Sequence, residues 1–257
     1  MSGMIFGAVI GYLFLHTLLG VIGGALLGYF FIEQRITRPN ISREELERIQ
    51  AIFFNTVFMM LGYVAKADGH ISENEIKLTE TYMEKMGLTA EHKREAIRLF
   101  KLGTEPDFNS QAQLKAFMGV AHHSPNLRQM LLVYLVNVAM ADGSLGSDEA
   151  RILREVASTL GFSRIAFEQL LQMIGAQNSF AGNHQSGAND VAIAYQALGV
   201  TKDNSDAEIK KAYRKLMSQY HPDKLIGQGL PDDMIKAATE RSQEIQAAYD
   251  VITKSRI

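Results

Sequence analysis

The first 32 residues contain no Asp, Glu, Lys or Arg, and the first charged residue is Glu33. A helix needs roughly 20 predominantly apolar residues to cross the hydrocarbon core of a bilayer, and residues 4–32 exceed that length. A cleaved signal peptide would have a basic segment followed by an apolar core of roughly 7–15 residues, and this stretch has neither feature. The sequence therefore predicts an uncleaved transmembrane anchor over residues 1–32.

The charges around this span predict its orientation. On the N-terminal side only the α-amino group is charged, whereas four arginines follow the span: Arg35, Arg38, Arg43 and Arg48. Positively charged flanks stay in the cytoplasm. We therefore expect a single-pass protein whose N-terminus lies outside the cytoplasm and whose remaining residues lie inside it.

Glycines within the span recur every four residues in two ladders, Gly3, Gly7 and Gly11 and then Gly20, Gly24 and Gly28. Glycine is common in membrane helices generally. This spacing, however, lines one helix face with small residues and lets a second backbone approach closely. It favours a homodimer formed through the transmembrane helix. His16 in mid-span is then expected to be a neutral, hydrogen-bonded residue of that interface rather than a functional ionisable group.

Composition excludes several classes of function for the rest of the chain. There are 26 Lys+Arg against 28 Asp+Glu, a formal net charge of −2, so there is no basic footprint for nucleic acid. The absence of cysteine excludes disulfides, zinc ribbons, iron–sulfur clusters and thiol nucleophiles. No phosphate-binding loop, zincin motif or nucleophile elbow occurs either. We expect a protein without enzymatic activity or cofactor.

Residues 33–174 show helical periodicity throughout and contain an internal repeat. Residues 67–71 (ADGHI) align with residues 141–145 (ADGSL) at an offset of 74, and the same offset pairs Gly87 with Gly161. Each copy therefore predicts a helix, an Asp-Gly turn, a second helix and a glycine stop. In the first copy Ser72 and Glu75 form a predicted capping box.

Four carboxylates occupy related positions in the two copies: Asp68, Glu75, Asp142 and Glu149. The pattern matches the second half of an EF-hand loop, but residues 64, 66, 138 and 140 stand where oxygen ligands are needed and are Val, Lys, Val and Met. Two alternatives remain open. The two turns either pack into one shared divalent-metal site, or the carboxylates are turn and capping residues, which is the favoured interpretation.

The repeat resembles the TerB-like helical domain over about residues 45–175. That resemblance implies a compact all-α bundle that engages partners or metal. The adjacent His122 and His123 are expected at a loop or helix end, since neighbours in a helix point to different faces and could not both bind one metal.

Residues 175–189 carry no charge and almost no large apolar side chain, which predicts a flexible linker. On this interpretation the third unit, residues 190–257, moves relative to the bundle. It begins with a short helix ending at Gly199. A second helix is expected over 206–220, capped by Ser205 and Glu208. A third is expected over about 231–253.

Between the last two helices stands His221-Pro222-Asp223, preceded by AEIKKAYRKL (207–216) and followed by EIQAAYDVI (244–252). These strings at this spacing resemble a J domain, a small antiparallel helical module. The resemblance implies a protein that stimulates ATP hydrolysis by a DnaK-type Hsp70 and hydrolyses nothing itself. It also implies that the tripeptide contacts the Hsp70, assisted by a basic face of Lys210, Lys211, Arg214 and Lys215 with Lys224 nearby.

The whole chain resembles the membrane-anchored DnaJ-like A family of Gram-negative bacteria. This implies a co-chaperone of the inner membrane, with a periplasmic N-terminus and cytoplasmic domains, that recruits an Hsp70 to the membrane surface. No Gly/Phe-rich stretch or cysteine-based zinc module accompanies the J domain, which favours delivery of Hsp70 over direct capture of unfolded clients. The alternative is a metal- or stress-sensing membrane scaffold that acts through the repeat carboxylates.

Overall fold

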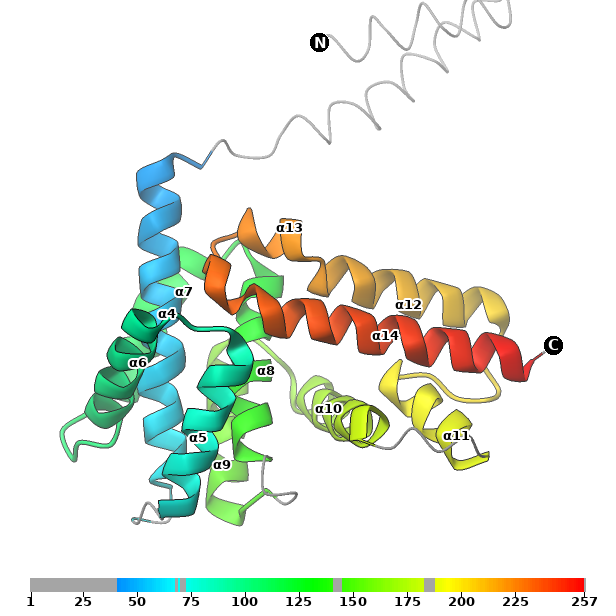
Figure 1. Cartoon of the computed structure of the whole chain (residues 1–257), viewed down its shortest axis with the longest axis horizontal. Helices are drawn as coiled ribbons and strands as arrows, with labels where there is room; N and C mark the ends of the chain where they lie inside the picture. Colours follow the sequence, from blue (N-terminus) through cyan, green and yellow to red (C-terminus); the bar gives the residue numbers. More distant parts are fainter. Residues whose placement is uncertain (1–40, 68, 70–72, 141–144, 183–187, 257) are drawn as a thin grey trace, which may run out of the picture. The chain divides into compact units, whose positions relative to one another are not determined.

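The computed structural model describes residues 41–67, 69, 73–140, 145–182 and 188–256. The predicted anchor with its glycine ladders and His16 lies outside these residues. Within the described ranges every regular element is helical, which confirms the all-α class (Figure 1). The bundle comprises α4 (Arg43–Ala65), α5 (Glu73–Met86), α6 (Ala90–Gly103), α7 (Ser110–Ala121), α8 (Pro125–Ala139), α9 (Ser147–Thr159) and α10 (Arg164–Gly182). The third unit comprises α11 (Ala188–Ala197), α12 (Asp206–Tyr220), α13 (Pro222–Ile226), the 3₁₀ turn η2 (Asp232–Met234) and α14 (Ile235–Ser255).

The core of the bundle forms between α4 and α8. Phe53 of α4 is fully buried, and its ring centroid lies 5.9 Å from that of Phe117 and 6.1 Å from that of Tyr134. In α8 seven consecutive residues, 130–136, are buried. A helix that is apolar on all sides has to be covered on all sides. Bundle helices and residues of the third unit together cover α8.

Among the described helices, α4 alone is long and apolar enough to cross a membrane. About half of its most apolar window, 56%, is nevertheless buried inside the protein. Phe53, Val57 and Phe58 have no exposed surface. We therefore assign α4 as the core helix of the bundle, distinct from the predicted anchor.

The glycine stops of the internal repeat are confirmed. Gly87 follows α5 with a φ of 90°, and Gly161 follows α9 with a φ of 86°. This left-handed region disfavours residues that carry a Cβ. The two copies thus end their second helix in the same way, as the offset of 74 predicts. Residues 141–144, which hold the second Asp-Gly turn, lie outside the described residues.

The predicted linker is wrong for most of its length. Residues 175–182 continue α10, and residues 188–189 already belong to α11. The physical reason is burial: Gln177 is 2% exposed and donates through Nε2 to the carbonyl of Ala197, at 2.9 Å. An uncharged segment thus packs α10 against α11 instead of being solvated.

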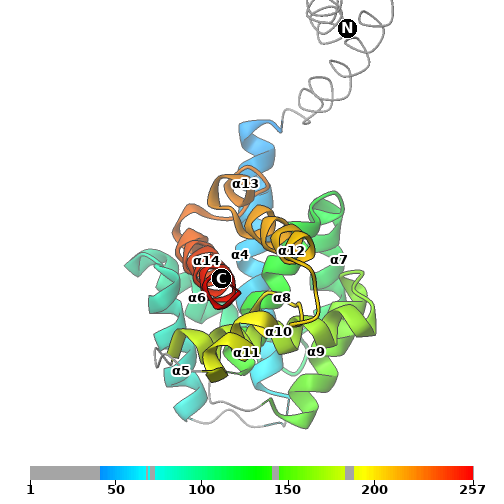
Figure 2. The same cartoon turned by 90° about the vertical axis from the view of Figure 1, so that its right-hand side faces the viewer.

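In the third unit α12 and α14 lie side by side, and α11 packs on both α10 and α14 (Figures 1 and 2). The Ser205–Glu208 capping box at the start of α12 is confirmed. The second helix spans Asp206–Tyr220, as predicted, and Pro222 begins α13 at a position where its missing N–H is not needed. The last helix starts at Ile235, after η2, rather than at residue 231.

The close crossing of α4 and α6 requires glycine in both helices. A Cβ at Gly62 would lie 2.0 Å from the carbonyl oxygen of Phe100, and one at Gly103 would lie 1.8 Å from that of Met59. We predict that Gly62→Ala forces these helices apart and lowers the free energy of unfolding by about 1–3 kcal/mol. Urea denaturation with a constant m value measures the change.

Gly119 in α7 provides the matched control, because a Cβ there meets nothing within 4 Å. Gly119→Ala should leave stability unchanged or raise it by up to about 1 kcal/mol, since alanine is the better helix former. Equal destabilisation by the two variants would contradict the close-crossing explanation.

Candidate functional site at the His-Pro-Asp turn

The turn between α12 and α14 is closed by its own backbone. His221 has an extended conformation, with φ −62° and ψ 121°, and Pro222 follows as the first residue of α13. The carbonyl of His221 accepts hydrogen bonds from the amides of Lys224 and Leu225, each at 3.1 Å. The pyrrolidine ring fixes φ, so the backbone is set before any partner arrives.

The two side chains that flank Pro222 face solvent. His221 and Asp223 are both exposed, whereas Leu225, on the other side of the same short helix, is fully buried. The turn therefore presents an imidazole and a carboxylate on a fixed backbone. Such a pair is suited to a partner that offers an arginine or another hydrogen-bond donor.

The basic residues of α12 form one solvent face. Lys210, Lys211, Arg214 and Lys215 are all exposed, while Ile209 and Leu216 on the other side of the helix are buried. Lys224 is half-buried, and its Nζ donates to Ser218 Oγ at 2.9 Å. Lys224 is thus tied to the end of α12 that carries the turn.

The start of α12 is fixed by its capping box. Glu208 Oε2 accepts from the Ser205 amide at 2.8 Å and from Ser205 Oγ at 2.9 Å. These hydrogen bonds hold the pKa of the Glu208 carboxyl below its usual value, with a smaller contribution from the charge of Lys211. The cap sets where the helix begins, and hence which residues form the basic face.

Tyr220, which directly precedes the tripeptide, connects the turn to the bundle. It is 2% exposed, and this burial raises the pKa of its hydroxyl. Its hydroxyl oxygen accepts from Gln129 Nε2 of α8 at 3.0 Å, and its carbonyl accepts from Ser242 Oγ of α14 at 3.0 Å. No local pattern in the sequence indicates Gln129 as the partner of Tyr220.

Arg241 is a second residue that the sequence analysis missed. It is 5% exposed, and it donates to Glu244 at 2.8 Å and to Asn137 of α8 at 3.1 Å. Burial raises the pKa of Glu244, and the charge of Arg241 opposes that shift. The spacing in the sequence could have indicated this residue. Arg241 lies three residues after Ala238 and four before Ile245, which places a cation on the apolar side of α14.

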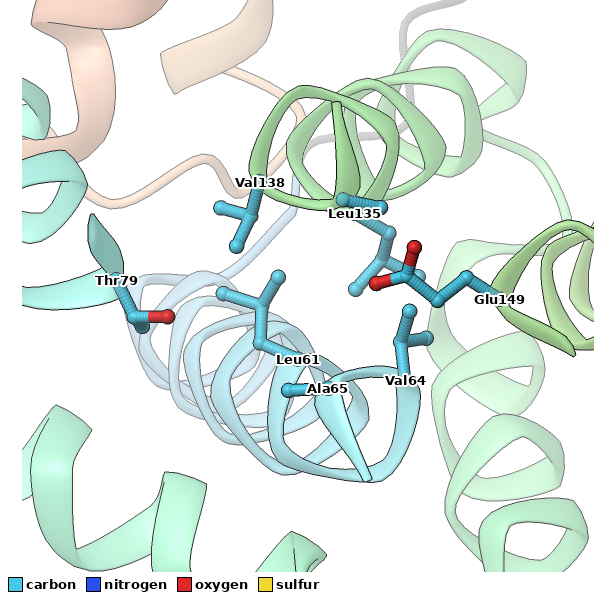
Figure 3. A pocket seen from close by; sticks show the side chains of 8 residues that line it. Leu61, Val64, Ala65, Thr79, Leu135, Val138 and Glu149 are labelled. Atoms are coloured by element: carbon cyan, nitrogen blue, oxygen red, sulfur yellow. The ribbon is translucent and has the colours of Figure 1, made fainter. Parts of the chain in front are cut away.

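The predicted metal residues are only partly described. The side chain of Glu149 reaches from α9 toward Val64 and Leu135 at a small pocket between α4 and α8 (Figure 3). Its Oε2 accepts from the amide of Gly146 at 2.9 Å, which is the capping role. The side chains of Asp68, Glu75 and Asp142 lie outside the described residues. The shared metal site therefore stays a prediction.

His122 and His123 lie at the C-terminal end of α7, as expected, and both are exposed. Their ring centroids are 3.7 Å apart. Across the described part of the chain, no group of three or more His, Cys, Asp or Glu side chains is placed to hold a metal ion.

Comparison with known families agrees with this division of the chain. Residues 54–172 match the family of tellurite resistance protein TerB, and residues 193–256 match the DnaJ domain. The first match covers the bundle from α4 to α10, and the second covers the unit that carries the His-Pro-Asp turn.

Several curated proteins are similar over most of the chain. The co-chaperone protein DjlA of Shewanella oneidensis is 40% identical over 80% of this chain and 79% of its own length. That of Coxiella burnetii is 39% identical over 84% and 82%, and that of Photorhabdus laumondii is 34% identical over 99% and 96%. No solved structure matches the chain. From its two domains in this order and its identity to these relatives, the chain belongs to the DjlA family of J-domain co-chaperones.

Proposed function

We propose that this protein stimulates the ATPase of a DnaK-type Hsp70 through the His-Pro-Asp turn and the basic face of α12. A J-domain co-chaperone acts on a partner and has no active site of its own. The observation that carries the proposal is the outward projection of His221 and Asp223 from a turn with a fixed backbone, beside a continuous basic face. A pre-set turn loses little conformational entropy on binding.

The roles of the residues follow from their chemistry. Asp223 offers a carboxylate for an arginine of the Hsp70. His221 offers a ring that donates a hydrogen bond and packs, and Pro222 keeps the two side chains apart at a constant angle. The basic face steers the encounter with an acidic surface of the partner.

Asp223→Asn tests the role of the turn. Loss of a charge-assisted hydrogen bond costs about 1.5–3 kcal/mol, so stimulation of Hsp70 ATP hydrolysis should fall by on the order of tenfold or more. The measurement is the steady-state ATPase rate of a bacterial DnaK with increasing amounts of wild type or variant. Unchanged stimulation by a variant with a wild-type circular dichroism spectrum and melting temperature would refute the assignment.

Charge reversal at Lys211 and Arg214 tests the basic face. The double variant to glutamate should need several-fold more protein for half-maximal stimulation at low salt, and the difference should shrink as salt screens the charges. The matched control reverses Lys101 and Lys115, which are exposed on α6 and α7 and bring the same change in net charge. Steering by the basic face is excluded if the two double variants behave alike.

We further propose that residues 1–32 anchor the protein in the inner membrane as a single-pass helix, with the N-terminus periplasmic and the described domains cytoplasmic. The uncharged span and the arginines that follow it support this proposal. The glycine ladders support a homodimer within the membrane. The anchor and the bundle would then choose the place at which the J domain activates Hsp70.

A single substitution in the second ladder tests the dimer. Gly24→Leu should greatly reduce the yield of cross-linked dimer in membranes, because a large side chain keeps the two backbones apart. Gly23→Leu is the control, because it introduces the same side chain one residue away, off the ladder face. Equal dimer yields from the two variants would contradict association through the ladders.

A further inference from the structure

We infer that the bundle positions the His-Pro-Asp turn, and that Gln129 of α8 is a positioning residue for it. The inference rests on the proposed function for its biochemical consequence and on the contacts of the described residues for its geometry. The turn is held on both of its flanks by side chains of the bundle, so that the J domain does not set its orientation alone.

The flank before the turn is held through Tyr220. Its hydroxyl accepts from Gln129 of α8, and its carbonyl accepts from Ser242 of α14. The ring is buried, so its hydroxyl depends on Gln129 for a donor in place of water. Since His221 is the next residue, any shift of Tyr220 moves the turn directly.

The flank after the turn is held at several points along residues 229–234. A Cβ at Gly229, whose φ is 104°, would lie 2.2 Å from Cγ2 of Ile49, so only glycine allows this approach to α4. Gln50 donates to the carbonyl of Leu230 at 3.4 Å, and Tyr134 donates through its hydroxyl to the carbonyl of Met234 at 2.7 Å. Figures 1 and 2 show this segment beside the first half of α4.

Two further contacts join the bundle to the same region. His92 of α6, through Nδ1, contacts the carboxylate of Asp233. Arg241 of α14 donates to Asn137 of α8. Both Tyr134 and Arg241 are buried, so leaving either polar group without a partner would be costly. Directional hydrogen bonds at buried groups select one arrangement of the two domains, which apolar packing alone does not.

These contacts surround the turn without covering it. His221 and Asp223 stay exposed, as do the four basic residues of α12. The bundle therefore supports the turn from behind and leaves its proposed Hsp70-facing side free. A turn that is already held in one conformation loses less conformational entropy on binding, while the side chains that would contact the partner stay the same.

The test is amide hydrogen exchange of the full chain in detergent, with Gln129→Leu as the variant. Leucine keeps the size of the side chain and leaves the Tyr220 hydroxyl buried without a donor. We expect about tenfold faster exchange at the amides that close the turn, those of Lys224, Leu225 and Gly227, because an unsatisfied buried group costs about a tenfold change in equilibrium. Amides of α9 should be unaffected, which shows that the bundle stays folded.

Two further variants make the result specific. Gln129→Leu combined with Tyr220→Phe removes both partners and should restore exchange to within about threefold of wild type. Gln246→Leu makes the same change at a glutamine that bonds the hydroxyl of Tyr213 within the J domain, away from the bundle. It should leave the turn amides unchanged. Equal exchange in wild type and Gln129→Leu, no recovery in the double variant, or the same effect from Gln246→Leu would each overturn the inference.

ATPase stimulation supplies the second measurement. A loosened turn still reaches the productive pose, so Gln129→Leu should raise the concentration for half-maximal stimulation by about three- to tenfold and leave the maximal rate within about twofold. If the maximal rate instead falls by three- to tenfold as well, Gln129 takes part in the stimulation step itself, and the positioning role is overturned. If wild type fails to stimulate while the exchange pattern holds, the proposed function fails and the positioning of the turn stands.

Discussion

The structure depends on the burial of α8 on all of its sides. Its apolar residues face α4 and its neighbours on one side, and its polar groups, Gln129, Tyr134 and Asn137, meet the J domain on another. Tyr134 combines both roles, since its ring packs against Phe53 in the bundle core while its hydroxyl bonds the backbone of Met234. A helix this apolar would be unstable in solvent. The two domains are therefore joined by the same element that forms the core of one of them.

This arrangement separates the two faces of the J domain. The face toward the bundle is buried and uses satisfied polar groups, such as the hydroxyl of Tyr220 and the guanidinium of Arg241, to fix its orientation. The opposite face keeps its cations and the tripeptide in water. Exposed charges of this kind contribute little to stability but add to the rate and selectivity of association. The fold thus uses buried contacts for position and leaves the surface charge available for the proposed recognition of Hsp70.

The sequence predicted features that depend on local chemistry. The capping box of Ser205 and Glu208, the paired stops at Gly87 and Gly161 and the tripeptide turn each lie within a few residues and have a local cause. The α8 partners of Tyr220 and Arg241 lie 91 and 104 residues away in the sequence, and no local pattern indicates which glutamine or asparagine will meet them. The linker prediction was wrong for the same reason. An uncharged stretch with few large side chains is typical of a coil, and only the presence of α11 makes it a packed helix.

Direct packing of the third domain on the bundle limits the directions in which it presents its turn. A J domain on a free coil would sample many directions, and its local concentration at a partner would depend on linker length. Here the segment after the turn contacts Ile49 and Gln50, in the part of α4 that follows the predicted anchor most closely in the chain. The orientation of the tripeptide is consequently tied to α4 rather than to a tether. A ligand or partner that shifted α4 against α8 would therefore move Gly229 and Leu230, which contact α4, relative to Tyr220 and Met234, which α8 holds, without touching the J domain itself.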